Sequence, residues 1–148
     1  MRFSSKGRYA IAALIYMAQK AYTEEQITII TIAQSLGISK IYLEQVFSML
    51  KRAAIVVSLK GSQGGYKLTR SPDKITVGDI ARAVETSLFE KTEKSVGKDA
   101  QAIDDAMENL VWGKLDSAIS ETLDQVTLLE LAEKSTSLRN TDNYMFFI

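Results

Sequence analysis

The sequence predicts a mainly α-helical fold with one small β-hairpin, and three observations predict it. In residues 38–52, apolar side chains recur at i, i+3, i+4 and i+7, the spacing of an amphipathic helix. These positions are Leu43, Val46, Phe47 and Leu50. Gly37 separates this helix from a shorter one, and glycine accepts the left-handed conformation of a tight turn. Two β-prone runs then enclose a glycine-rich turn at residues 61–65. Helix, turn, helix and hairpin in this order are the pattern of a winged helix-turn-helix.

The other segments are mostly helical, and five of the predicted helices have a residue suited to capping their N-terminus. The predicted N-cap residues are Ser4 or Ser5, Thr28, Ser39, Thr76 and Thr127. The first helix is apolar nearly all round, so we expect it to bury more than one face. Residues 86–98 show no sustained period and are predicted to be a linker. The last helix is predicted to be short, with polar residues 135–143 forming a flexible stretch before the C-terminus.

A long helix is predicted between about residues 99 and 123. Its apolar side chains form two stripes, which suggests that it packs against its own domain and against a second subunit. The residues assigned to dimerisation are Ile103, Met107, Leu110, Val111, Leu115 and Ile119. We therefore predict a long C-terminal dimerisation helix after the winged domain.

Charge is unevenly distributed along the chain. The 148 residues have a formal net charge of zero. Residues 1–80, however, contain eleven lysines and arginines against five acidic residues, and residues 81–148 contain seven against thirteen. A net charge of +6 in one part and −6 in the other indicates a nucleic-acid-binding part and an assembly or partner-binding part. The alternative is a solvated surface whose charges are unevenly spread.

Composition excludes several kinds of chemistry. The chain has no cysteine and no histidine, so it has no disulfide, no Cys/His zinc site, no thiol nucleophile and no imidazole base. Its adjacent acidic pairs, such as Asp104-Asp105, point in different directions on a helix and are interpreted as surface charge. We expect no enzyme activity and no metal site. No run approaches the roughly 18 apolar residues of a membrane span, and a cytoplasmic protein is expected.

A polar, mostly basic helix face beside a basic hairpin suits the grooves of DNA. Tyr42, Glu44 and Gln45 are the predicted base readers, since glutamate can accept a hydrogen bond from cytosine N4 and glutamine can pair with adenine. The hydroxyl of Ser39 and the free amides of the helix start are predicted to bind a phosphate. The other candidate DNA contacts are Arg2, Lys6, Lys40, Lys51, Arg52, Lys60 and Gly61. For each lysine the alternative is an ordinary solvated side chain.

Five segments of the chain resemble the Rrf-type winged-helix repressors. They are residues 1–10, Ile38-Ser39, residues 42–45, Gly61 with residues 64–66, and residues 75–80. This bacterial family includes the regulators IscR, NsrR and CymR, and the likeness is close over residues 1–85. The resemblance implies a homodimer whose long helices cross, presenting two winged domains to a partly palindromic operator. It also implies that Glu44 reads bases and that Lys60 of the wing enters the minor groove.

Three positions depart from the family pattern. The cluster-binding members carry three cysteines between the winged domain and the dimer helix, and this chain has none, so we expect no iron–sulfur cluster and no cofactor. Ala54 stands where the family usually has glycine. If its backbone is left-handed, alanine costs about 1 kcal/mol there; a local rearrangement is the alternative. Thr31 replaces an acidic residue of the second helix, so a reciprocal capping box is lost.

The C-terminus suggests a regulatory partner. The cysteine-free layout and the last five residues most resemble the cysteine-metabolism repressors of the CymR type, which work with cysteine synthase as co-repressor. That enzyme accepts partner C-termini ending in isoleucine. The residues assigned to this contact are Tyr144, Met145, Phe146, Phe147 and Ile148. The hypothesis is that cysteine synthase strengthens operator binding and that O-acetylserine competes for its pocket; the alternative is that the tail packs in the dimer core.

The predicted organisation is a winged helix-turn-helix domain in residues 1–85, a linker in residues 86–98, and a dimerisation helix, short helix and tail in residues 99–148. The predicted function is a homodimeric DNA-binding repressor of sulfur and cysteine metabolism genes that blocks a promoter when bound to its double-stranded operator. Two alternatives stay open. One is a repressor that senses a small molecule between the winged domain and the dimer helix, and the other is an interaction protein that does not bind DNA.

Overall fold

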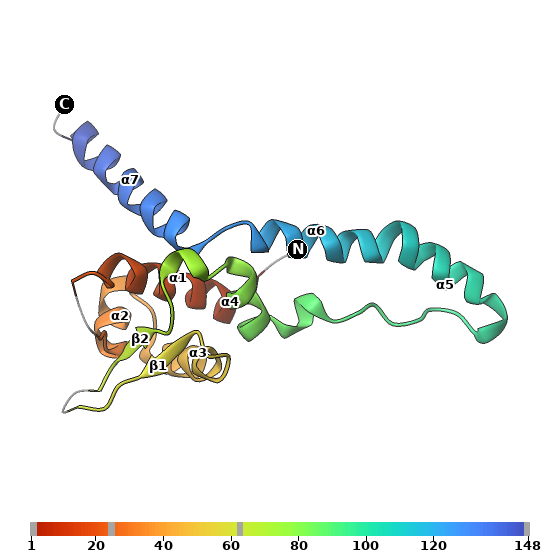
Figure 1. The fold of residues 1–148 in the computed structure, drawn as a ribbon, viewed down its shortest axis with the longest axis horizontal. Coiled ribbons are helices and arrows are strands. Elements are labelled where there is room, and N and C mark those ends of the chain that lie inside the picture. Colours follow the sequence, from red (N-terminus) through yellow and green to blue (C-terminus); the bar gives the residue numbers. More distant parts are fainter. Residues whose placement is uncertain (1–2, 24–25, 62–63, 147–148) are drawn as a thin grey trace.

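The computed structural model describes residues 3–23, 26–61 and 64–146. It shows a helical body with one hairpin, from which a helical arm and the C-terminal helix project in different directions (Figure 1). The regular elements are α1 (Ser5–Lys20), α2 (Ile29–Leu36), α3 (Lys40–Arg52), β1 (Val56–Ser58), β2 (Tyr66–Leu68), α4 (Val77–Val84), α5 (Gln101–Met107), α6 (Gly113–Asp124) and α7 (Leu128–Phe146). The predicted mainly helical fold with one hairpin is confirmed.

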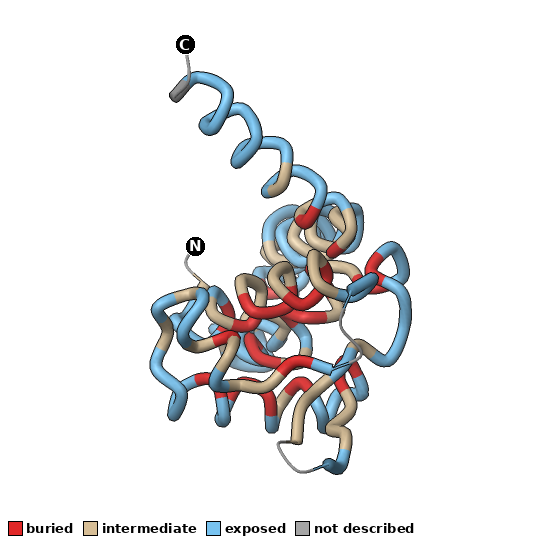
Figure 2. Tube along the Cα trace, turned by 90° about the vertical axis from the view of Figure 1, so that its left-hand side faces the viewer, coloured by how far each residue is buried: buried red, intermediate tan, exposed pale blue. Residues whose placement is uncertain are grey.

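Helix α1 is the centre of the body and packs against α2, α3, α4 and α7. Its buried side chains are mostly small, including Ala10 and Ala13, which lets the neighbouring helices approach closely. Buried residues are concentrated in this body, whereas the outer part of α7 is exposed (Figure 2). The hydroxyl of Ser4 accepts a hydrogen bond from the Gly7 amide at 3.1 Å, so Ser4, not Ser5, caps the helix.

The helix-turn-helix forms as predicted. Thr28 caps α2 by accepting a bond from the Thr31 amide at 3.1 Å, and Gly37 ends that helix with a left-handed φ of 65°. Ser39 precedes α3, but the prediction that its hydroxyl caps the helix is wrong. Its ψ of 129° is lower than that of Ser4 (165°) or Thr28 (152°), so its side chain is not directed at the first-turn amides.

The wing is attached to the body along both edges of β2. On one edge β1 pairs antiparallel with it, Val57 lying opposite Lys67. On the other edge Tyr66 and Ile27 exchange two backbone hydrogen bonds of 2.9 and 2.8 Å. The Tyr66 ring also lies 4.8 Å from that of Phe47 in α3. The segment before α2 thus fixes the wing beside α3, a long-range pairing that the sequence pattern did not predict.

Ala54, at the end of α3, has a φ of 57°, so of the two alternatives for this position the left-handed backbone is correct. Its amide donates to the Lys51 carbonyl at 3.0 Å, and its carbonyl accepts a bond of 2.6 Å from the Thr69 hydroxyl. Both bonds use backbone atoms of residue 54, and its side chain is exposed. Glycine could therefore replace this alanine without the loss of any contact.

We expect Ala54→Gly to raise the free energy of unfolding by about 0.5–1 kcal/mol. Relief of the left-handed strain, about 1–2 kcal/mol, exceeds the extra chain entropy that glycine loses on folding. Ala53 is the matched control, because its φ of −83° suits alanine. A urea titration measures both variants, and Ala53→Gly should lower the free energy of unfolding. If Ala54→Gly also lowered it, the assignment of backbone strain to Ala54 would be wrong.

The C-terminal helix is fastened to the body at its start. The Val77 amide donates to the Val126 carbonyl at 2.9 Å, and the Leu128 amide donates to the Ile75 carbonyl at 2.8 Å. Thr127 and Glu130 form a reciprocal capping box in which the Thr127 amide and hydroxyl donate to the carboxylate at 2.7 and 3.0 Å. These bonds lower the pKa of Glu130. Thr127 is thus confirmed as the start of the last helix.

The predicted short length of this helix, and the predicted flexible stretch after it, are wrong. Helix α7 continues to Phe146. Residues 128–146 contain no proline or glycine to end it, and the Thr141 hydroxyl bonds back to the Ser137 carbonyl at 3.0 Å within the helix. A firmly anchored first turn also removes the nucleation cost that limits isolated polar helices.

The arm consists of α5, a π-helical turn and α6 in one continuous run (Figure 1). The predicted long helix is confirmed, but the π turn at Glu108–Trp112 was not predicted. Its signature is the Gly113 amide, which donates to the Glu108 carbonyl five residues earlier. A π turn carries one extra residue, so stripes counted at 3.6 residues per turn change phase there.

The linker is tied to the arm by one carboxylate. Asp104 is 8% exposed and accepts hydrogen bonds from the Ser95 amide at 3.0 Å and the Val96 amide at 3.4 Å, so its interpretation as surface charge is wrong. Residues 90–97 have no regular structure, and the linker before them contains a 3₁₀ turn at Thr86–Phe89.

Within the described ranges, no helix has the length and apolarity needed to cross a bilayer.

Candidate nucleic-acid interface

The outward face of α3 is the centre of the candidate interface. Ile41, Gln45, Ser48 and Arg52 recur at i, i+4, i+7 and i+11 and are all exposed. The opposite face, which contains Phe47, is fully buried in the core. The exposed face forms one side of a shallow hollow of about 540 Å³. The residues that line it are Lys6, Ile41, Glu44, Gln45, Ser48, Met49 and Arg52.

The structure brings four predicted DNA contacts into this hollow, namely Lys6 of α1 and Glu44, Gln45 and Arg52 of α3. It also adds Ile41 and Ser48, which the sequence analysis did not select. The signal for both was available, since they lie three or four positions from the predicted base readers on the same helix.

Tyr42, the third predicted base reader, contacts α1 and does not line the hollow. Its ring makes an edge-to-face contact with Tyr9, with 5.8 Å between the ring centroids, and 47% of the residue is exposed. Lys40 forms an i,i+4 ion pair of 3.5 Å with Glu44, and both side chains are more than half exposed. Such a pair contributes little to stability. The Glu44 carboxylate is therefore available to exchange Lys40 for a base donor.

The remaining predicted contacts lie around this face. Lys51 lies next to Arg52 in the last turn of α3, where both charges also suit the negative end of the helix dipole. Lys60 and Gly61 are exposed at the start of the wing turn, and the exposed Ser39 hydroxyl is not used as a cap. Arg2 lies outside the described residues.

A buried carboxylate places the start of α1 beside this face. Glu85 is 8% exposed, and its Oε1 accepts hydrogen bonds from the Ser4 amide at 2.5 Å and the Ser4 hydroxyl at 2.6 Å. The negative charge lies at the N-terminus of α1, where the helix dipole favours it. Glu85 thereby fixes the helical turn that carries Lys6. Sequence reasoning missed this residue; the signal was the unexplained Gly7, over which the carboxylate lies.

The arm carries an uncovered apolar surface. Ile103, Leu110, Val111 and Leu115 are all exposed, Leu110 by 66%. Met107 and Ile119 are half-buried. Scattered apolar side chains are ordinary on protein surfaces, but a run of large ones along one projecting element is typical of an interaction surface.

One ion pair joins the arm to the winged domain. The Arg82 guanidinium donates to both oxygens of Asp124, at 2.7 and 2.8 Å, and so links α4 to α6. The same guanidinium lies 5.0 Å from the centroid of the Phe89 ring in the linker. The bonds from Arg82 lower the pKa of the Asp124 carboxyl below its ordinary 3.8, and they raise the pKa of Arg82.

We expect Asp124→Asn to lower the free energy of unfolding at neutral pH by less than about 1 kcal/mol, because both side chains are partly exposed and solvent screens the pair. The depressed pKa means that this stabilisation is complete above about pH 4 and is lost as the pH falls through the folded value. The variant and the wild type should therefore converge in stability as the pH falls through the lowered pKa of Asp124. A difference that is constant from pH 7 to pH 3 would contradict the assignment.

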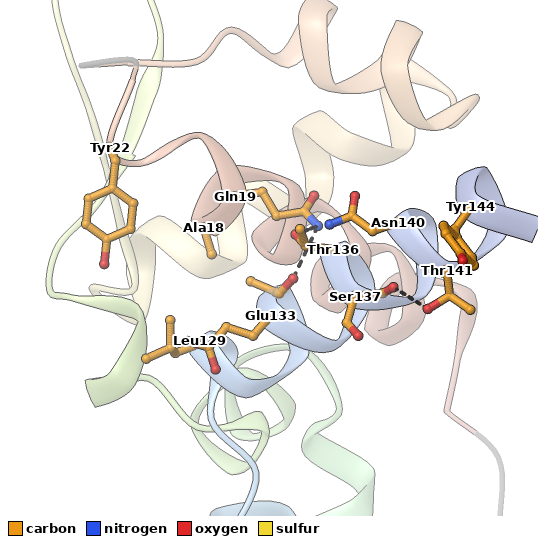
Figure 3. Close-up of a pocket in the computed structure, with 11 residues that line it drawn as sticks. Ala18, Gln19, Tyr22, Leu129, Glu133, Thr136, Ser137, Asn140, Thr141 and Tyr144 are labelled. Carbon is orange, nitrogen blue, oxygen red and sulfur yellow. Dashed lines mark hydrogen bonds between the residues drawn. The ribbon is translucent and has the colours of Figure 1, made fainter. Parts of the chain in front are cut away.

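A second surface, between α1 and α7, is a wide groove of about 710 Å³ (Figure 3). Gln19 of α1 crosses its base and donates from its side-chain amide to the Ala132 carbonyl at 3.4 Å and the Thr136 hydroxyl at 3.3 Å. Tyr144 lies at the outer end of the groove and, like Met145, is mostly exposed. Phe147 and Ile148 lie outside the described residues, and Phe146 is placed by its backbone alone.

The chain matches the family model described as Rrf2, iron-dependent transcriptional regulator, over residues 3–134. It is 35% identical to the HTH-type transcriptional regulator CymR of Bacillus subtilis (strain 168) over 148 residues, which cover 100% of both chains. It is 39% identical over 132 residues to the HTH-type transcriptional regulator IscR of Aliivibrio salmonicida (strain LFI1238), covering 88% of this chain and 77% of the relative.

Solved structures agree with these matches. The structure of B. subtilis CymR, described there as the global cysteine regulator, superposes with a TM-score of 0.71 at 35% identity and covers 90% of this chain and 98% of CymR. The IscR of T. potens gives a TM-score of 0.68 at 32% identity and covers 91% and 88% of the two chains. The relatives named here are regulators of transcription.

The iron in the family description does not fit the donors of this chain. Iron–sulfur clusters are ligated chiefly by cysteine thiolates, sometimes with histidine, and the chain has neither residue. Among residues 3–23, 26–61 and 64–146, no three acidic side chains are grouped closely enough to bind a metal ion.

Proposed function

The chain belongs to the Rrf2 family of transcriptional regulators, and on that premise we propose that it is a homodimeric repressor of sulfur and cysteine metabolism genes. The observation that carries this proposal is the exposed, mostly polar face of α3, which shares a hollow with Lys6 of α1. In this proposal residues 1–85 bind the operator and residues 99–148 form the dimer and bind the regulatory partner. A dimer on its operator blocks the promoter sterically.

DNA recognition divides between two kinds of contact. Glu44 and Gln45 face the hollow beside α3 and read base edges in the major groove, while Lys6, Arg52 and Lys60 contact phosphates or the minor groove. A carboxylate at the DNA surface lowers affinity in general, so Glu44 works by penalising base pairs that offer it no donor. The two winged domains of a dimer present their α3 helices to half-sites about one helical turn apart.

Binding to a duplex at increasing salt tests this assignment. We expect the logarithm of the affinity to fall linearly with the logarithm of the salt concentration. The slope of this plot should steepen by about 0.9 for each phosphate contact. Glu44→Ala should relax the preference for one base pair in each half-site and weaken binding only modestly. Salt-independent or absent binding would favour the alternative of an interaction protein that does not use DNA.

The proposed regulatory partner is cysteine synthase. Full-length identity of 35% to CymR, and the likeness to the structure described as a global cysteine regulator, support a role in sulfur control. Helix α7 points away from the body (Figure 1), and Tyr144 and Met145 near its end are exposed. In this proposal the enzyme binds the C-terminal isoleucine and its carboxylate, which strengthens operator binding, and O-acetylserine competes for the same pocket.

Calorimetric titration of cysteine synthase with the intact chain, and with a chain lacking Ile148, tests the partner. We expect binding by the intact protein that is lost on deletion. A matched control is Asn143→Ala, which changes an exposed residue of the same helix without altering the terminal carboxylate. Equal binding by the intact and the shortened chain would overturn the tail as the contact, and no binding by either would remove cysteine synthase as the signal.

A second candidate is direct sensing of a small molecule. A cavity of about 300 Å³ lies between the end of α1, β2 and Pro72, within the winged domain rather than beside the dimer helix where the sequence analysis placed such a pocket. Its walls combine Met17, Tyr66 and Leu68 with the cationic Arg70. A rise in melting temperature on addition of O-acetylserine alone, with no enzyme present, would favour this alternative.

A further inference from the structure

Ile41 is an apolar side chain in the middle of a polar surface. It is the second residue of α3 and is 68% exposed, more than its neighbour Tyr42. Of the residues that line the hollow beside α3, Ile41 and Met49 alone are apolar, and Met49 is half-buried against the core. An exposed isoleucine does not help α3 to form, since its branched Cβ makes it a poorer helix former than alanine.

The fold does not use Ile41. The core of α3 comes from the opposite face, where Leu43 and Phe47 are fully buried. Ile41 is also absent from the half-buried residues packed around that core. On the outward face it is aligned with Gln45, Ser48 and Arg52, which follow it at helical spacing. The side chain is therefore located where the helix meets DNA.

Major-groove chemistry identifies a partner for such a side chain. Base edges in this groove offer hydrogen-bond donors and acceptors, and thymine alone among the four bases adds an apolar group, its C5-methyl. Glu44, Gln45 and Ser48 can satisfy donors and acceptors, but none of them has an apolar end for a methyl group. Ile41 has one, and its burial against the methyl removes apolar surface of both partners from water.

We propose that Ile41 is a specificity-determining residue that recognises the C5-methyl group of a thymine in each operator half-site. The inference rests on the proposed function, because it requires α3 to lie in the major groove. It adds a thymine to the base pairs selected by Glu44 and Gln45, at a position near the N-terminus of the helix. A helix N-terminus commonly makes the deepest base contacts in this kind of motif.

Selection from a library of random duplex DNA tests the proposal without knowledge of the operator. The wild type and Ile41→Ala are each used to enrich bound sequences. Because Ile41 is exposed and alanine is a good helix former, the substitution should leave α3 intact. We expect the wild type to enrich a partly palindromic motif with an invariant thymine in each half-site, and Ile41→Ala to enrich the same motif without that thymine. Gln45→Ala is the matched control, and it should lose a different position while it retains the thymine.

Replacement of the selected thymine by deoxyuridine then removes only the methyl group. For the wild type we expect about a fourfold loss of affinity per half-site, from one apolar carbon no longer buried. Ile41→Ala should bind the thymine and uracil duplexes equally, and Ile41→Val should show an intermediate loss. Uracil placed outside the half-sites is the control and should change nothing.

The outcomes separate this inference from the function on which it rests. If the wild type enriches no motif, the proposed function is overturned and the inference with it. If the wild type and Ile41→Ala enrich the same thymine, or if uracil weakens both proteins equally, DNA recognition stands and the assignment of Ile41 is overturned.

Discussion

Gly7→Ala is expected to destabilise the winged domain by about 2–3 kcal/mol, although alanine is normally the better residue inside a helix. A Cβ at position 7 would clash with Oε1 of Glu85 and would lie 2.8 Å from its Cδ. The carboxylate must move, which breaks its two short bonds to Ser4. Loss of charge-assisted hydrogen bonds, about 1.5–3 kcal/mol each, outweighs the gain of about 1 kcal/mol in helix propensity. Equilibrium unfolding in urea measures the difference.

The sign of this effect should reverse when Glu85 is removed. In a Glu85→Ala background no carboxylate lies over Gly7, and Gly7→Ala should then stabilise by up to about 1 kcal/mol. Gly97→Ala is the matched control, since a Cβ there meets nothing within 4 Å and the φ of −69° suits alanine. If Gly7→Ala changed stability equally in both backgrounds, the contact with Glu85 would not be the cause.

Glutamate at both Leu110 and Leu115 is expected to convert the protein to monomers and to weaken operator binding by at least about 100-fold. Both side chains are more than half exposed on the projecting arm, so their burial requires a second chain. In a dimer the two new carboxylates would be removed from water in the centre of an apolar interface with no partner to compensate their charge, which disfavours association. A monomer then binds each half-site independently and loses the gain of about 10²–10⁴ that a linked pair provides.

Sedimentation equilibrium and a binding titration on operator DNA measure these two effects. Because neither leucine contributes to the core of the winged domain, its secondary structure should be retained. Asn109→Glu is the matched control: it adds a negative charge at an exposed residue next to Leu110, about 100° around the helix from it. A double variant that stays dimeric and binds operator like the wild type would overturn the role of the arm.

The parts of the fold that depend on neighbouring residues along the chain, such as turns, helix starts and buried helix faces, were predictable from the sequence. Gly37 predicted the turn before α3, Thr28 and Thr76 predicted the starts of two helices, and the spacing of Leu43 and Phe47 predicted the buried face of α3. Local signals failed where they were weak or incomplete. Residues 135–143 are mostly polar and have little periodicity, so α7 was predicted too short, and the π turn in the arm has no recognised sequence signature.

The candidate site shows the same division. The residues of α3 that face outward follow from helical spacing, so Glu44 and Gln45 could be selected in advance. Ile41 lies on the same outward face by the same spacing, but it was not among the predicted contacts. Its exposure is decided by how α3 packs against α1 and α4, which spacing alone does not reveal.

The sequence by itself determined the family, the helix starts and the chemistry that the chain lacks, because composition and spacing are properties of residues close together along the chain. Only the tertiary structure decided that Glu85 lies over Gly7, that Ile27 pairs with Tyr66, and that Arg82 joins Asp124 across 42 residues. A periodic pattern records which face of an element is buried, but not what is packed against it. That choice is made by the fold as a whole, through contacts between residues far apart in sequence.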